Sequence, residues 1–224
     1  MENISKENYL KEIFNREEDF KGPVSTSFLA EKLNVSRSAV SDMAKRLSEE
    51  GYIKYKKYYG IQLLPRGRDL AVEVVRKHRL WELFLVETLN MSMCEVHDEA
   101  ELLEHMTSTK LIDKIDKFLG RPKFDPHGDP IPNKNGKIPR LKKAISLSES
   151  KEMEKYVVTR IKDNQKETIN YLKQLGITLG EVVVTKKILP NNGGVLIKKG
   201  KTLHSLSNKL ANGVFVTLSK ESLQ

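Results

Sequence analysis

A chain of 224 residues with 38% hydrophobic and 31% charged residues has the composition of a polar globular protein with two or three small domains. No apolar run approaches the roughly 20 residues that cross a bilayer, and the N-terminal MENISKENYLKE lacks the features of a secretory signal. The single cysteine excludes an intramolecular disulfide, so we expect a cytoplasmic protein without a membrane partner. The formal net charge of +9 favours a polyanionic partner.

The first part of the chain predicts three helices and a hairpin. Apolar residues at helical spacing predict a helix over residues 6–16, followed by a second helix at 26–33. Ser36 is suited to cap a third helix at 37–50. Two β-rich runs around Gly60 then predict a hairpin. A helix–turn–helix followed by such a hairpin is the winged helix-turn-helix pattern of DNA-binding proteins.

The hairpin supports this interpretation because its basic residues are not interrupted by acids. From Lys54 to Arg68 there are five basic residues and no carboxylate. This favours double-stranded DNA as the partner over an ordinary three-helix domain with a surface hairpin. Short side chains at the start of the third helix are suited to base edges, and hairpin lysines to phosphates. The expected DNA-contacting residues are Arg37, Ser38, Ala39, Ser41, Asp42, Lys45, Lys54, Lys56 and Lys57.

A long helix is predicted next, at residues 68–89. Its apolar residues cover more than one side, which indicates packing against another domain or another subunit. Helices at 95–106 and 108–119 follow. The segment 121–137 is rich in proline, glycine and asparagine and is therefore predicted to be a loop.

Histidines and carboxylates recur at helical spacing in these central helices. His78 and Glu82 are four residues apart and lie on one helix face. At about 100° per residue, a second helix face gathers His97, Glu101, Glu104 and His105. An acidic helix face is usually just a solvated one. The imidazoles among mutually repelling carboxylates favour a transition-metal site instead, and the loop adds Asp125 and His127 as further candidate ligands.

The last part of the chain is β-rich. Residues 152–161 are predicted to be partly strand, and residues 163–175 a short helix that ends at Gly176. Three β-rich runs, EVVVTKKILP, GGVLIKKG and GVFVTLSK, then follow at short intervals. Glycine, asparagine and proline separate them, as expected for a small β-barrel or sheet.

Together these residues resemble the diphtheria-toxin-repressor family of metal-dependent transcriptional regulators. The resemblance covers essentially the whole chain and rests on NYLKEIF, LAEKLNVSRSAVSDMAKRLSEEGYI, LLPRGRDLA, RKHRLWELFL, VHDEAELLEH and GDPIP. It implies a fold that is mainly α with α+β parts. The expected domains are a winged helix-turn-helix at 1–70, a helical metal-binding and dimerisation domain at 71–140, a linker at 141–150 and a FeoA-like small β-barrel at 151–224.

The resemblance also implies two metal sites. The first would use His78, Glu82 and His97. Asp163 matches a carboxylate that reaches this site in the three-domain branch, and Asp125–His127 resembles a ligand-bearing loop of some manganese-type members. The second, regulatory site would use Glu101, Glu104 and His105.

Three positions depart from the family pattern at the second site. Glu101 stands where iron-type members have cysteine, and a carboxylate favours Mn²⁺, with Fe²⁺ the next choice. Asn8 replaces a methionine or aspartate, so either its carbonyl oxygen or Glu7 would complete the site. Lys11 stands where shorter manganese regulators have a carboxylate, and their two-metal cluster therefore does not transfer directly.

We therefore expect a homodimeric, metal-activated repressor of metal-uptake genes that binds an approximately palindromic operator and is not an enzyme. One alternative is a winged-helix regulator whose DNA binding is independent of metal or follows another ligand. A metal-dependent hydrolase is disfavoured because the chain has no HExxH motif and no nucleophile–base arrangement supported by spacing.

Overall fold

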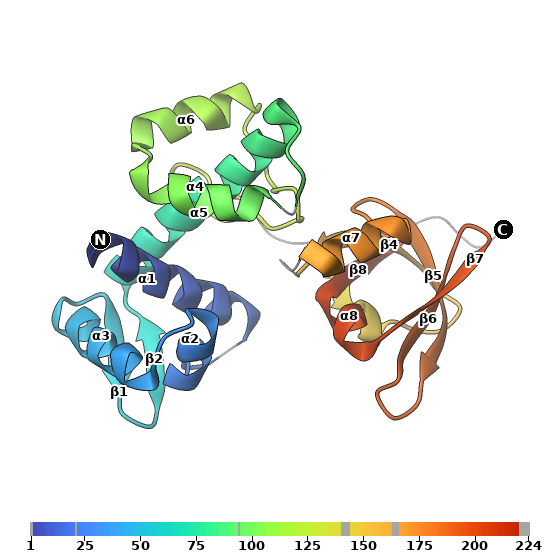
Figure 1. Cartoon of the computed structure of the whole chain (residues 1–224), viewed down its shortest axis with the longest axis horizontal. Helices are drawn as coiled ribbons and strands as arrows, with labels where there is room; N and C mark the ends of the chain where they lie inside the picture. Colours follow the sequence, from blue (N-terminus) through green and yellow to red (C-terminus); the bar gives the residue numbers. More distant parts are fainter. Residues whose placement is uncertain (1, 21, 94, 140–143, 163–165, 220–224) are drawn as a thin grey trace. The chain divides into compact units, whose positions relative to one another are not determined.

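The computed structural model describes residues 2–20, 22–93, 95–139, 144–162 and 166–219 (Figure 1). The chain forms two compact units, each assembled from separate stretches of sequence. Unit 1 comprises Met1–Trp81, Ala100–Arg121 and Pro132–Ile138, and unit 2 comprises Glu82–Glu99, Pro122–Ile131 and Pro139–Gln224. Within the described ranges, no helix is both long and apolar enough to cross a bilayer.

Unit 1 contains the predicted winged helix-turn-helix. Its caps explain the helix limits: Ser25 Oγ accepts a hydrogen bond from Phe28 N, and Ser36 Oγ accepts one from Ala39 N, both at 3.1 Å. Gly51 follows the third helix with a φ of +75°, the left-handed conformation of a helix C-terminus. The elements are α1 (Glu2–Asp19), α2 (Thr26–Lys32), α3 (Arg37–Glu49), β1 (Ile53–Lys56) and β2 (Gly60–Leu63).

A single apolar core joins these elements to the next helix. Leu10 and Ile13 of α1 are fully buried in it, together with Leu47 of α3 and Ile61 of β2. Val75, on the long helix that follows, belongs to the same cluster. Burial of each such side chain contributes roughly 1.5–3 kcal/mol. The helix α1 is therefore an integral part of the DNA-binding fold.

The three predicted central helices are confirmed as α4 (Pro65–Leu89), α5 (Val96–Met106) and α6 (Thr109–Phe118). Within unit 1, the buried Arg76 of α4 forms ion pairs with α6. Its Nη2 lies 2.9 Å from both Asp113 Oδ1 and Asp116 Oδ2. Trp81 Nε1 donates a hydrogen bond to Thr107 Oγ1 at 2.7 Å. The division between the units falls inside α4, after Trp81, and inside α5, after Glu99.

The C-terminal part of unit 2 is a six-stranded antiparallel sheet in the order β3-β8-β4-β5-β6-β7. Buried valines and isoleucines from alternate positions of its strands form a second core with Leu172 of α7. The elements are β3 (Ile145–Ser146), a 3₁₀ turn η1 (Leu147–Glu149), β4 (Lys155–Ile161), α7 (Lys166–Gln174), β5 (Val182–Leu189), β6 (Gly194–Lys199), β7 (Thr202–Leu206), α8 (Asn208–Gly213) and β8 (Val214–Leu218).

The C-terminal part of the chain contains more strands and helices than the sequence pattern predicted. Strand β7 was not predicted, because its residues TLHSL pack on one edge and are mostly exposed, so they carry little apolar signal. The short helix α8 was also missed. Residues 145–149 were expected in a linker but form β3 and η1, which pack with β8 and α8 of the sheet. The predicted helix start at 163–165 lies outside the described residues.

Candidate metal centre and DNA-binding face

In unit 2, two imidazoles converge on one buried carboxylate. Glu82, near the C-terminal end of α4, is only 3% exposed. Its Oε1 lies 3.3 Å from His97 Nδ1 on α5 and 3.8 Å from His127 Nε2 on the loop before β3. The structure thus brings together three of the predicted ligands from three separate segments. Imidazole nitrogen and carboxylate oxygen are donors that suit Mn²⁺, Fe²⁺ and Zn²⁺.

The loop that carries His127 is held by Asp125. Asp125 Oδ1 accepts hydrogen bonds from the backbone nitrogens of His127 at 2.8 Å and Asp129 at 2.9 Å. This Asx-type turn uses the oxygen that sequence reasoning offered as a ligand. Asp125 therefore orients the loop, while His127 faces Glu82.

The same loop is anchored to β4 of the sheet. Ile161 N donates a hydrogen bond to His127 O at 3.0 Å, and Arg160 Nη2 lies 2.6 Å from Asp129 Oδ1. Gly128 passes so close to the strand that an added Cβ would lie 2.2 Å from Thr159 O. The position of His127 consequently depends on the C-terminal sheet. Asp163, the other residue predicted to reach this site, lies outside the described residues.

In unit 1, a second cluster surrounds Glu104 of α5. This side chain is completely buried, and its Oε2 lies 2.5 Å from His78 Nδ1 of α4. The ligand atoms of Glu101, Glu104 and His105 all lie within 4.8 Å of one another. The cluster predicted from helical spacing is therefore compact.

The N-terminal helix contributes a cation to this cluster. Lys11 of α1 is 3% exposed, and its Nζ lies 2.5 Å from Glu101 Oε1 and 2.6 Å from Glu104 Oε1. Burial acts to lower the pKa of Lys11, but Glu104 and Glu101 outweigh it and raise the pKa above its ordinary value of 10.5. Lys11 is thus an ammonium ion at neutral pH. Sequence reasoning noticed this lysine only as a departure from a pattern.

Glu7 and Asn8 of α1 are the residues predicted to complete the second site. Glu7 Oε2 lies 2.5 Å from His105 Nδ1, so Glu7 is the side chain that reaches the cluster. Asn8 Oδ1 is buried and accepts no hydrogen bond from the residues that the structure describes. The cluster is therefore linked to α1 through Glu7 and Lys11.

The predicted DNA-contacting residues lie on α3 and the hairpin. Those exposed at the start of α3 are Arg37, Ser38 and Ala39, and those exposed on the hairpin are Lys54, Lys56 and Lys57. The other three have partners within α3: Ser41 Oγ donates to Arg37 O at 2.9 Å, and the exposed Lys45 Nζ lies 3.2 Å from Asp42 Oδ1. The hairpin tip adds Tyr58, which is 92% exposed.

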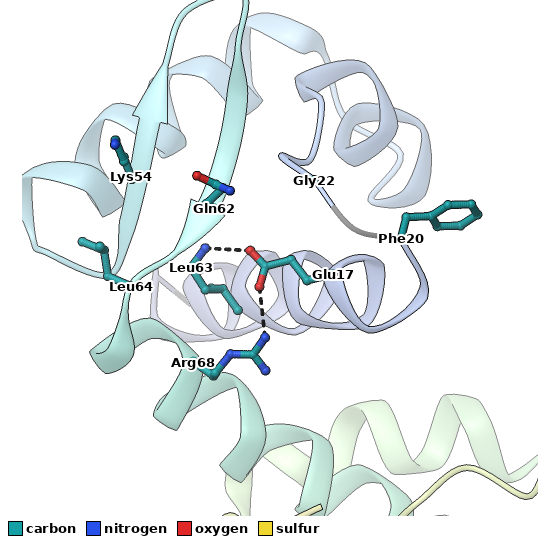
Figure 2. Close-up of a pocket in the computed structure, with 8 residues that line it drawn as sticks. All are labelled: Glu17, Phe20, Gly22, Lys54, Gln62, Leu63, Leu64 and Arg68. Atoms are coloured by element: carbon teal, nitrogen blue, oxygen red, sulfur yellow. Dashed lines mark hydrogen bonds and ion pairs between the residues drawn. The ribbon is translucent and has the colours of Figure 1, made fainter. Parts of the chain in front are cut away.

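A cleft of about 470 Å³ lies beside the hairpin, between α1, β2 and the start of α4 (Figure 2). Glu17 crosses it, accepting a hydrogen bond from Leu63 N at 2.9 Å and pairing with Arg68 at 3.3 Å. None of the predicted metal ligands lines it. The cleft is therefore separate from both clusters.

Three family models match successive parts of the chain. The iron-dependent repressor N-terminal DNA-binding domain matches residues 3–61, the iron-dependent repressor metal-binding and dimerisation domain matches 64–133, and the FeoA domain matches 145–218. These three regions coincide with the winged helix-turn-helix, the central helices with their loop, and the sheet. The predicted fold class is thereby confirmed.

Individual relatives agree with the models. The structure of a manganese-dependent transcriptional repressor in complex with manganese is 34% identical, covers 96% of this chain and 100% of its own, and has a TM-score of 0.90. The manganese regulator SloR is 33% identical over 96% of this chain and 98% of its own, with a TM-score of 0.80. The iron-dependent repressor IdeR of Mycobacterium leprae is 29% identical, covering 94% of this chain and 95% of its own.

Proposed function

The chain belongs to the iron-dependent repressor family, and we propose that it is a homodimeric repressor of metal-uptake genes that binds its operator when Mn²⁺ or Fe²⁺ occupies the centre around Glu82. The family consists of DNA-binding transcriptional repressors and not of enzymes. Manganese is the preferred metal, because the solved relatives include manganese-dependent repressors and because the candidate ligands are nitrogen and oxygen atoms.

The convergence of His97 and His127 on the buried Glu82 carries the proposal. His78 lies 2.5 Å from Glu104 of unit 1, and its part in the first site is retained only as a proposal from the sequence resemblance. When bound, the metal supplies a divalent charge that neutralises Glu82 and holds the two imidazoles to it. Asp125 keeps the loop of His127 in place, and Asp163 is retained as a further proposed ligand from the sequence resemblance.

Contacts along α1 supply a physical route from the α5 cluster to the DNA-binding face. Lys11 and Glu7 of α1 bind Glu101, Glu104 and His105 of α5. Leu10 and Ile13 of the same helix lie in the core shared with α3. A shift of α5 relative to α4 is therefore transmitted to the recognition helix through α1.

Self-association is supported by the matched dimerisation domain and by exposed apolar side chains on α5 and α6. Leu102 and Met106 of α5 are 69% and 82% exposed, and Phe118 of α6 is 68% exposed. A two-fold dimer would present two α3 helices to an approximately palindromic operator, with half-sites one or more helical turns apart. Because such a repressor acts on genomic DNA, we place it in the cytoplasm.

The test is operator binding with and without a chelator. Duplexes enriched from a random pool in the presence of Mn²⁺ supply the probe, and fluorescence anisotropy measures affinity in Mn²⁺, Fe²⁺, Zn²⁺ or EDTA. EDTA is expected to weaken binding at least about tenfold, the size of an ordinary allosteric coupling. Undiminished binding in EDTA would favour the alternative of a metal-independent regulator.

A pair of histidine variants places the effect at the proposed centre. His97→Gln is expected to lose the response to Mn²⁺, because it removes one of the imidazoles facing Glu82. His204→Gln changes a histidine of β7 and is expected to respond like the unaltered protein. Equal responses in the two variants would show that the metal acts elsewhere.

A further inference from the structure

The cluster on α5 already contains a cation that belongs to the chain. Lys11 Nζ lies 2.5 Å from Glu101 Oε1 and 2.6 Å from Glu104 Oε1, so one ammonium bridges both carboxylates. Its side chain is 4% exposed and that of Glu104 is completely buried. Water has almost no access to this pair, and each charge depends on the other for neutralisation.

The ammonium occupies the position that a second metal ion would need. An ion that shared Glu101 Oε1 and Glu104 Oε1 would lie close to the two oxygen atoms that Lys11 contacts. Two cations at that distance in a buried site repel each other strongly, because the local dielectric constant is low. With the Lys11 ammonium in place, the residues present therefore do not fit a second metal between Glu101 Oε1 and Glu104 Oε1.

Other close contacts in the cluster involve its two histidines. The second carboxylate oxygen of Glu104 lies 2.5 Å from His78 Nδ1. His105 Nδ1 lies 2.5 Å from Glu7 Oε2, and its Nε2 lies 3.2 Å from Glu104 Oε1. Within the described residues, Glu104 therefore has a close partner at each of its two carboxylate oxygens.

The lysine cannot be removed by dilution or by a chelator. Its neighbours on α1, Leu10 and Ile13, are fully buried in the core of unit 1, so the helix presents the ammonium to α5 at a constant place. A tethered cation has an effective concentration that does not fall on dilution. The link between α1 and α5 is consequently present without metal.

We infer that the Lys11 ammonium is the resident cation of the Glu101–Glu104–His105 cluster, so that each chain takes up a single regulatory metal ion, at the centre around Glu82. This inference rests on the proposed function for the Glu82 centre. The two clusters then have different roles. The cluster of Lys11 holds α1 to α5 whether or not metal is present, and only the Glu82 centre responds to the metal concentration.

Metal stoichiometry tests the inference with the full chain. Equilibrium dialysis against saturating Mn²⁺, followed by elemental analysis, is carried out on the unaltered protein, on Lys11→Met and on Lys6→Met. Lys6 is the control, since it lies on the same helix but pairs with Glu50 at 2.7 Å, outside the cluster. About one Mn²⁺ per chain is expected for the unaltered protein and the control, and about two for Lys11→Met, in which the site is vacated.

Each other outcome has a definite meaning. Two ions in the unaltered protein, or one in both it and Lys11→Met, would overturn the resident-cation inference. No ion in the unaltered protein but one in Lys11→Met would retain the inference and refute the proposed function. No ion in either would refute both.

A second measurement covers loss of stability in the variant. Without its ammonium, the buried Glu104 is left unneutralised, so Lys11→Met is expected to melt at a lower temperature in EDTA. Saturating Mn²⁺ should raise its melting temperature by more than it raises that of the unaltered protein, because an extra ion binds the folded state. An equal rise in both proteins would contradict the inference, and Lys11→Gln repeats the comparison with a polar side chain.

Discussion

The proposed metal chemistry of this chain depends on how two buried carboxylates are neutralised. Glu82 and Glu104 are 3% and 0% exposed, and an isolated charge at such positions is expensive. Glu104 contacts both Lys11 of α1 and His78 of α4. Glu82 faces His97 and His127, which are the natural partners of a transition metal. Two similar glutamates on neighbouring helices thus acquire different roles from their partners.

The Glu82 centre is tested by removing one charge without changing shape. Glu82→Gln is expected to lower Mn²⁺ affinity, measured by calorimetry, by about 10- to 100-fold or more. Glu73→Gln is the control, because Glu73 lies on the same helix and pairs with Lys77 at an exposed position. Retention of full affinity in Glu82→Gln would place the metal at a different site.

Metal preference supplies a second prediction for single residues. Sequence reasoning attributed a preference for Mn²⁺ to Glu101, but in the structure this carboxylate binds Lys11. Glu101→Cys alone is therefore expected to leave the ranking of Mn²⁺ and Fe²⁺ in operator binding unchanged. The double variant Glu101→Cys with Lys11→Met should shift the ranking towards Fe²⁺, because a thiolate is then available to the metal. A shift in the single variant would show that Glu101 already acts as a ligand.

At the scale of elements, α1 and the loop at 122–131 each connect one cluster to a separate fold. Helix α1 supplies Lys11 to the α5 cluster and Leu10 to the core of the DNA-binding elements. The loop presents His127 to Glu82 and hydrogen-bonds to Ile161 of β4. The position of Lys11 thus depends on the core of the DNA-binding elements, and the position of His127 depends on β4.

The loop connection can be tested at Gly128, where φ is +87° and an added Cβ would lie 2.2 Å from Thr159 O. Gly128→Ala is expected to destabilise the folded protein by more than about 1 kcal/mol in thermal unfolding. It should also weaken Mn²⁺ binding, because the backbone that carries His127 must move. Gly180→Ala is the control, since its φ is also positive, at +81°, but nothing lies within 4 Å of the added Cβ. Equal Mn²⁺ affinities in the two variants would exclude a role for the loop.

At the scale of the whole molecule, the proposed repressor requires two copies of the chain. Its exposed lysines and its single recognition helix cover one half-site, and phosphate contacts by themselves carry little sequence information. The exposed apolar residues of α5 and α6 give the central helices a surface suited to a second copy.

A single substitution on that surface tests the dimer. Phe118→Asp is expected to convert the protein to a monomer in analytical ultracentrifugation, because it places a charge in an apolar interface. Operator affinity should fall by about 100-fold or more, since half of the DNA contacts are lost. Leu218→Asp serves as the control, because Leu218 of β8 is 63% exposed but belongs to the C-terminal sheet. If the Phe118→Asp variant remained a dimer, the dimer interface would have to lie on another surface.

Much of this organisation could be predicted from local patterns in the chain. The spacing of apolar residues, the cap at Ser36 and the turn at Gly51 predict the helix–turn–helix without reference to distant residues. Helical spacing likewise places Glu101, Glu104 and His105 on one face of α5. These features depend on interactions within a few residues, for which sequence periodicity is a sufficient guide. Edge strand β7 was missed because half-exposed strands lack that periodicity.

Only the tertiary structure decided which side chains meet across the chain. Ninety or more positions separate Lys11 from Glu101 and Glu104, and no local pattern reveals that its ammonium lies between them. The sequence determined the DNA-binding fold, the family and the set of donor atoms. Packing of α1 against α5 determined which cation neutralises the second cluster, because buried charges are paired by proximity in space and not by spacing along the chain.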